Sequence, residues 1–353
     1  MSFKDGWAAV HLEMPRRVPR TEYSLEGHWE YLSALTGKTI TIDSPGEVKW
    51  AAAQELWRKW NFDFYWGTII GGQYFGKWQT DMGHAVYAAG GVDYRSIGGC
   101  PFKTPEEALA LDPESMFTAP NHAELVKSFT DSWQNTRKNP AMDGVPSTGI
   151  YTTCISGLIA IFGWDMLLLA AGTDPEAFGE MTNRYCRWMQ RCFNALAEAD
   201  APVVMIHDDM VWTAGAFIHP DWYRKYVFPN FKKYFAPLKD SGKKITFTAD
   251  GNYTEFIDDL VDAGVDGFVL EPMTDMAYIA EKYGRTHYFI GNADTRILLH
   301  NDKKAIRAEV ERCMNIGKKC PGFFMAVGNH IPPNTPVDAV IYYNEVYEEL
   351  AVR

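Results

Sequence analysis

The chain has 353 residues, of which 46% are hydrophobic and 14% aromatic, and its formal net charge is −11 at pH 7. This charge and the absence of a Lys/Arg run argue against a nucleic-acid partner, because phosphate backbones bind to concentrated positive surfaces. No window approaches 18 uncharged apolar residues, and the first residues lack the apolar core of a signal peptide. We therefore expect a soluble cytoplasmic protein with no membrane partner.

Taken in chain order, the sequence predicts a helical cap, a first strand and long insertions. Residues 1–48 are expected to form the cap, and Phe62–Ile70 the first strand. Residues 71–145 are rich in Gly, Pro, Asp and Trp and have weak periodicity. We interpret this stretch as insertions between early strands, with a lid over the mouth of the fold as one role.

From residue 149 onward, short apolar runs alternate with segments of helical periodicity. The runs are nearly continuously apolar, as in parallel strands that are covered on both faces. The segments between them, such as Thr254–Ala263 and Ala305–Ile316, repeat apolar residues every three or four positions. This alternation predicts one α/β domain over residues 1–353, a (β/α)8 TIM barrel. The six runs are Gly149–Cys154, Pro202–Asp209, Lys244–Asp250, Val265–Pro272, His287–Asp294 and Gly322–His330.

Polar side chains stand at the ends of these runs, and the carboxyl ends of the strands carry the chemistry of such barrels. Each one has a structural alternative, because Asp250 and Asp294 are also placed to cap the helices that follow them. Glu271 precedes a proline and is a poor cap, so helix capping does not explain every polar residue at the strand ends, which are called tips below. The tips are His207, Asp208, Asp209, Asp250, Glu271, Asn292, Asp294, Asn329 and His330.

Several carboxylates that face one another near an imidazole repel, so we expect a cation among them or a raised pKa on at least one. Oxygen ligands with one histidine suit Zn²⁺ or another divalent ion that acts as a Lewis acid. A metal-free site for acid–base chemistry is the alternative. The chain has no Gly-rich phosphate-binding motif, so no nucleotide cofactor is expected.

The order of motifs over roughly residues 200–345 resembles the uroporphyrinogen decarboxylase superfamily. In Asp208–Lys239 an acidic pair precedes a P-x-x-Y helix, and Lys244–Pro272 (KITFTADGNYTEFIDDLVDAGVDGFVLEP) resembles the strand, helix and strand that follow. IGNADTRILL (Ile290–Leu299) and VGNHIPPNTPVDAV (Val327–Val340) resemble its last two strand–loop units. The resemblance implies the same barrel fold.

The superfamily has two main branches, which differ in their motifs. Decarboxylases carry an N-terminal R-Q-A-G-R signature that holds substrate carboxylates, whereas this chain has PRRVPRTE at Pro15–Glu22. Corrinoid-dependent methyltransferases that act on thiols have zinc-binding His-x-Cys and Cys positions, which fall here on Thr248, Asp250 and Asn329. Oxygen ligands in place of sulfur imply a harder metal site, suited to polarising an ether oxygen.

This resemblance implies a methyltransferase that moves a methyl group from a methoxylated aromatic compound, or a related small methyl donor, to a corrinoid protein. The chain lacks a D-x-H-x-x-G cobalt-ligating motif, so the corrinoid is expected on a partner protein. The expected metal ligands are Asp250, Glu271 and His330, with Asn329 as a fourth group, and the metal is expected to be zinc. His207 or Asp209 is expected to donate the proton or orient the substrate.

The expected pocket wall consists of Tyr65, Trp66, Tyr151 and Trp212. A homodimer is compatible with the sequence. Two other functions stay open: a cofactor-free decarboxylase of the uroporphyrinogen type, and a corrinoid- or aromatic-binding protein without catalysis.

Overall fold

Parallel strands form the centre of the molecule, a computed structural model that describes residues 3–81 and 99–353. Six strands pair side by side in one sheet in chain order. They are β3 (Thr148–Ile150), β4 (Val203–His207), β5 (Lys244–Thr248), β6 (Gly267–Val269), β7 (Tyr288–Ile290) and β8 (Phe323–Phe324). β1 (Phe64–Tyr65) pairs in parallel with β2 (Val145–Pro146), and β2 leads directly into β3. All these pairs are parallel, as the continuous apolar runs predicted.

An extended N-terminal segment, residues 19–22, fills the remaining position between β8 and β1. The Thr21 N–H donates to the Met325 carbonyl, the Met325 N–H donates to the Pro19 carbonyl, and the Asp63 N–H donates to the Arg20 carbonyl. The predicted cap of residues 1–48 is therefore only partly helical. Pro and Arg are unusual in a central strand, which is why this segment carries no strand signal in the sequence.

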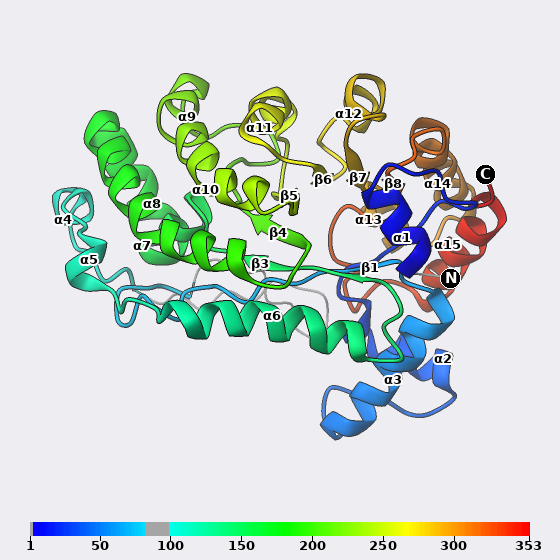
Figure 1. Cartoon of the computed structure of the whole chain (residues 1–353). Coiled ribbons are helices and arrows are strands. Elements are labelled where there is room, and N and C mark those ends of the chain that lie inside the picture. Colours follow the sequence, from blue (N-terminus) through cyan, green and yellow to red (C-terminus); the bar gives the residue numbers. More distant parts are fainter. Residues whose placement is uncertain (1–2, 82–98) are drawn as a thin grey trace.

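Figure 1 shows the helices arranged around the outside of the strands. The helices are α1 (Phe3–Val10), α2 (Trp29–Thr36), α3 (Gly46–Trp60), α4 (Pro105–Leu109), α5 (Pro113–Met116), α6 (His122–Lys138), α7 (Ile155–Thr173), α8 (Pro175–Glu198), α9 (Pro220–Tyr226), α10 (Phe228–Asp240), α11 (Ile257–Ala263), α12 (Met276–Tyr283), α13 (Thr295–Leu299), α14 (Lys303–Gly317) and α15 (Val337–Leu350). Together with the parallel strands they form the predicted (β/α)8 architecture.

The stretch interpreted as insertions contains a helix of the barrel wall. α6 buries Leu125, Phe129 and Trp133, which are spaced four residues apart, and it packs against α8, β2 and β3. Three buried residues among many polar ones give a weak periodic signal, so the sequence alone did not reveal this helix. Residues 82–98, which belong to the predicted lid, lie outside the described part of the chain.

α7 is a long and strongly apolar helix, which the sequence analysis did not single out. Within the described residues it is the one helix with the length and composition of a membrane span, with a mean hydropathy of 1.8 over its most apolar window. Asp165 interrupts the run, and 67% of that window is buried inside the fold. The helix packs against α4 and α8, as a core helix of a barrel wall does.

The barrel interior is filled at its amino-terminal end. Phe64, Val203 and Phe324 from three strands pack there with Ala9 and Val10 of α1. α1 therefore closes this end, and any site for a ligand within the barrel is reached from the carboxyl ends of the strands.

Candidate active site

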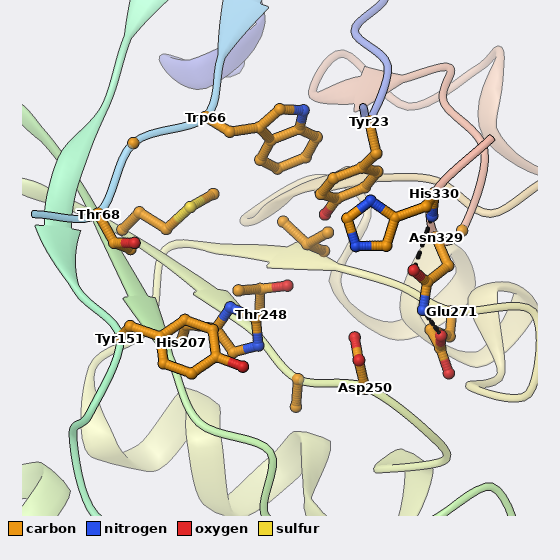
Figure 2. A pocket seen from close by; sticks show the side chains of 15 residues that line it. Tyr23, Trp66, Thr68, Tyr151, His207, Thr248, Asp250, Glu271, Asn329 and His330 are labelled. Atoms are coloured by element: carbon orange, nitrogen blue, oxygen red, sulfur yellow. Dashed lines mark hydrogen bonds between the residues drawn. The ribbon is translucent and has the colours of Figure 1, made fainter. Parts of the chain in front are cut away.

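A cavity of about 370 Å³ lies at the carboxyl ends of the strands. In Figure 2, His207 and Tyr151 lie on one side of it, Glu271, Asn329 and His330 lie on the other, and Asp250 projects between them. The described lining contains aromatic, polar and acidic side chains but no Arg or Lys. The lining residues are Tyr23, Trp66, Gly67, Thr68, Tyr151, Met205, His207, Thr248, Ala249, Asp250, Val269, Glu271, Gly328, Asn329 and His330.

His207 and Asp209 form an ion pair at the end of β4. The distance from His207 Nε2 to Asp209 Oδ1 is 2.7 Å, and the Tyr151 hydroxyl donates to Asp209 Oδ2 at 2.8 Å. The Asp250 N–H also donates to Asp209 Oδ1, at 3.1 Å. These contacts fix the Asp209 carboxylate and hold the imidazole against the Tyr151 ring, with 4.1 Å between the ring centres.

The pair shifts the pKa of both partners toward the charged forms. Burial disfavours ionisation of Asp209, but the charge of His207 and its hydrogen bonds outweigh burial and lower the pKa to about 2. Burial likewise disfavours the His207 imidazolium, yet the Asp209 charge raises the pKa of His207. Each partner therefore favours the charged form of the other.

Asp250 faces the cavity and does not cap a helix. Neither the 3-10 helix Thr254–Phe256 nor α11 has a side-chain cap, and the nearest contact is that of Asn252 Oδ1, which accepts the Thr254 N–H at 3.1 Å. Desolvation at the barrel mouth, together with the charge of Asp209, raises the pKa of Asp250 to about 7, although solvent reaches the side chain through the cavity. Gly251 makes this turn possible, because its φ is +90° and a Cβ there would lie 2.5 Å from the Trp212 carbonyl oxygen.

A second polar group lies across the cavity from His207. Glu271 Oε2 accepts the Gly251 N–H at 2.6 Å, and Glu271 Oε1 accepts a hydrogen bond from the Asn329 amide. The His330 N–H donates to Asn329 Oδ1 at 2.7 Å, and His330 Nδ1 bonds to the Ser24 hydroxyl. Loops that follow β6 and β8 therefore meet through one hydrogen-bond chain.

Asp208, between the two members of the ion pair, points away from the cavity. Its buried carboxylate accepts N–H groups of Cys154 (2.7 Å), Ile155 (3.2 Å) and Ser156 (2.8 Å) at the start of α7. Burial raises the pKa of Asp208 to about 7 in spite of these donors. Its role is structural, because it anchors α7 to β4.

Two of the four predicted wall residues reach the cavity. Trp66 and Tyr151 line it, whereas Tyr65 is buried against Trp57 of α3. Side chains alternate along β1, so Phe64 and Trp66 point into the barrel and Tyr65 points outward. Trp212 lies in the loop after β4, is 46% exposed and packs against Trp164 and Phe217.

Tyr23, which the sequence reasoning missed, forms part of the wall. Its ring stacks on Trp66 with 4.1 Å between ring centres and 11° between planes. Trp66 Nε1 in turn donates to the Glu22 carbonyl at 3.0 Å. Tyr23 directly follows the extended segment that closes the barrel. The sequence would indicate Tyr23 as a wall residue only if that segment were recognised as a strand.

The predicted ligands do not gather as one set. Donor atoms of His207, Asp209 and Asp250 lie within 4.8 Å of one another. Asp250 is thus grouped with the two residues that were expected to act as acids, while Glu271 and His330 belong to the hydrogen-bond chain across the cavity. One imidazole and two carboxylates are a donor set that a divalent transition metal accepts with open positions left for substrate.

Comparison with known proteins places this arrangement in a family. The family model described as Uroporphyrinogen decarboxylase (URO-D) matches residues 92–350. The chain belongs to the uroporphyrinogen decarboxylase family. Named uroporphyrinogen decarboxylases of Thermus thermophilus and Carboxydothermus hydrogenoformans are 31% and 29% identical over 163 and 177 residues. These matches cover 46% and 50% of this chain and 46% and 49% of the relatives, so the chain spans about half the length of the curated relatives it matches.

The fold is also that of a solved methyltransferase from Methanosarcina mazei. The two chains superpose with a TM-score of 0.65 at 16% identity, over 97% of this chain and 96% of the other. This likeness confirms the barrel fold across nearly the whole length, the N-terminal third included.

Proposed function

We propose that this protein is a methyltransferase that passes a methyl group from a methoxylated aromatic compound, or a related small methyl donor, to a separate corrinoid protein in the cytoplasm. The observation that carries the proposal is the lining of the cavity. Aromatic walls face a cluster of carboxylates and imidazoles, and none of the described lining residues is Arg or Lys. The shared fold with a protein named as a methyltransferase supports the same reaction class.

His207, Asp209 and Asp250 are the residues proposed to hold a metal ion, with zinc as the expected metal. When bound, zinc supplies a Lewis acid that stabilises negative charge on the departing ether oxygen. The donor set fits this role, because hard oxygen ligands suit an oxygen leaving group better than thiolates do. Tyr151 and Ser156 keep Asp209 in place through hydrogen bonds of 2.8 and 3.4 Å.

The other lining residues bind the substrate. The stacked pair of Tyr23 and Trp66 offers a flat apolar face on which an aromatic ring can lie. The departing oxygen lies at the first cluster, so its proton comes from water that enters through the mouth of the cavity. His330, which was expected as a ligand, stays in the hydrogen-bond chain with Asn329 and Ser24.

The methyl acceptor is proposed to be the corrinoid of the partner protein. Because α1 fills the amino-terminal end of the barrel, the partner has to approach the carboxyl end, where the cavity opens. A methyl group transferred within this cavity is shielded from bulk water, which favours transfer over hydrolysis.

The test is a reconstituted assay with a methoxyphenol and a reduced corrinoid protein, in which the absorbance spectrum reports formation of the methylated corrinoid. Methylation is expected only when enzyme, donor and corrinoid protein are all present, and Asp250→Ala should abolish it. Asp294→Ala is the matched control, because Asp294 only caps α13 and pairs with Arg296. Release of the phenol without any corrinoid protein would refute the proposal.

Cofactor-free decarboxylation of uroporphyrinogen is the second candidate, favoured by the family and by the names of the curated relatives. A substrate with many carboxylates needs cations in the cavity, and the N-terminal arginines point elsewhere. Arg17 pairs with Asp63 at 2.8 Å, and the buried Arg20 pairs with Glu22 at 3.0 Å. Conversion of uroporphyrinogen by the purified protein would establish this candidate in place of the first.

A further inference from the structure

Carboxylates and imidazoles line the cavity. The carboxylates are those of Asp250 and Glu271, and the groups able to carry positive charge among the described lining residues are His207 and His330. His207 is already paired with Asp209. Water screens charges poorly in a partly enclosed cavity, so a ligand carboxylate placed beside Glu271 meets like-charge repulsion.

His207 and Glu271 lie on opposite sides of the cavity, and Asp250 projects between them (Figure 2). The donor atoms of Asp209 and Asp250 lie close to that of His207. Met205 and Val269 line the space at the base of the cavity. A ligand that places an ether oxygen at the first cluster therefore directs the far side of its ring toward Glu271.

Glu271 is held ready to accept further hydrogen bonds. One oxygen takes the Gly251 N–H at 2.6 Å and the other takes the Asn329 amide, which orients the carboxylate from both sides. An ionised carboxylate has about four acceptor sites, so two protein donors leave room for a donor from the ligand. A hydroxyl or an ammonium group matches this wall, and a second carboxylate does not.

We propose that the substrate is an aromatic methyl ether without negative charge that presents a hydroxyl or ammonium hydrogen-bond donor to Glu271. This inference rests on the proposed function for the identity of the reacting methoxy group. The recognition itself depends on the walls of the cavity and is measurable without any methyl transfer. Charged methoxybenzoates are then excluded, although they share the ring and the ether.

A matched ligand series tests the inference by isothermal titration calorimetry at pH 8, without corrinoid protein. The ligands are 4-hydroxy-3-methoxybenzyl alcohol, the corresponding benzylamine and the corresponding benzoate, which differ in one substituent. The alcohol and the amine are expected to bind, and the benzoate to bind about ten-fold or more weakly, since like charges in one site cost at least that much.

Two substitutions test whether Glu271 causes the selectivity for uncharged or cationic ligands. Glu271→Gln should remove the advantage of the amine and strengthen binding of the benzoate, because the amide keeps the size and loses the charge. Glu281→Gln, on the exposed face of α12, should leave all three affinities unchanged. Equal affinity of wild type for the alcohol and the benzoate, unchanged ratios in Glu271→Gln, or binding of none of the three overturns the inference.

The two proposals fail in different ways. Binding in the expected order with no methylation of any corrinoid protein removes the methyltransferase function and leaves the charge selectivity intact. Methyl transfer from the benzoate as efficient as from the alcohol removes the selectivity and leaves the function intact.

Discussion

His207 and Asp209 meet across a single intervening residue, with 2.7 Å between Nε2 and Oδ1 at the end of β4. Side chains alternate along a strand, so these two share a face and Asp208 takes the opposite one. The three consecutive polar residues His207, Asp208 and Asp209 therefore have two different roles. His207 lines the cavity and is held by Asp209, whereas Asp208 anchors α7.

The ion pair should make stability depend on pH within a defined window. The pKa of Asp209 is lowered to about 2, so its contribution is complete above the unfolded value of about 4 and is lost as pH falls toward 2. The pKa of His207 is raised, so its contribution is complete below the unfolded value of about 6.5 and is lost as pH rises through the folded pKa.

Asp209→Asn should therefore be most destabilising between about pH 4 and 6.5, by about 1.5–3 kcal/mol, the range for a hydrogen bond to a charged group. Denaturant titrations at pH 3, 5 and 8 in the presence of a chelator would measure the free energy of unfolding. A difference between variant and wild type that stays constant from pH 3 to 8 would contradict the ion pair.

Asp208→Ala should destabilise the fold far more than loss of an ordinary cap. The substitution leaves three buried N–H groups of α7 without their acceptor, and each buried unsatisfied donor costs about 1–3 kcal/mol. Asp174→Ala is the matched control, since Asp174 caps α8 at an exposed position and such a cap contributes about 1 kcal/mol. Equal losses in thermal unfolding of the two variants would show that Asp208 does not anchor α7.

Metal analysis separates the two possible ligand sets. After loading with zinc and dialysis at pH 8, His207→Ala and Asp250→Ala should retain at most about a tenth of the wild-type zinc, because ligand loss costs more than the ten-fold or greater effect of outer-shell changes. Glu271→Gln and His330→Ala should retain it. If the latter pair loses zinc and His207→Ala keeps it, the ligands are those that the sequence indicated.

Two neighbouring aromatic residues at the end of β1 should respond differently to truncation. Trp66→Ala should weaken binding of a methoxyphenol about 3- to 10-fold, as expected for loss of one aromatic contact, and should destabilise the fold less than Tyr65→Ala, because Trp66 is only partly buried. Tyr65→Ala should lower the free energy of unfolding by about 3 kcal/mol, because the ring is buried against α3, and leave binding unchanged. The reverse pattern would mean that the inward and outward faces of β1 are misassigned.

The second half of the barrel could be predicted from sequence because its strands are short, apolar and followed by polar tips. Each of β4 to β8 falls within a predicted run, β3 begins one residue before its run, and the tips His207, Asp250 and Glu271 do line one cavity. The sequence could not say which tips approach one another, since the direction of each side chain depends on the turn that follows. For example, the Gly251 N–H donates to Glu271, whereas the N–H of the preceding Asp250 donates to Asp209.

The first third was less predictable for two physical reasons. The α6 helix has only a narrow apolar stripe among charged residues. The segment around Arg20 pairs as a strand although it contains Pro and Arg. Arg20 is tolerated in that position because its guanidinium lies 4.1 Å from the Trp60 ring centre and pairs with Glu22. The contact with Trp60 is tertiary, so no local sequence pattern indicates it.

Closure of the barrel by this segment also orders the events of folding. Glu22 accepts the Val327 N–H across 305 positions of sequence, and Tyr23 stands next to it in the cavity wall. Contacts so distant in the chain form late, because loop closure has to be achieved first. During synthesis, the cavity wall around Tyr23 is thus among the last parts to be completed, because Met325 and Val327 have to leave the ribosome first.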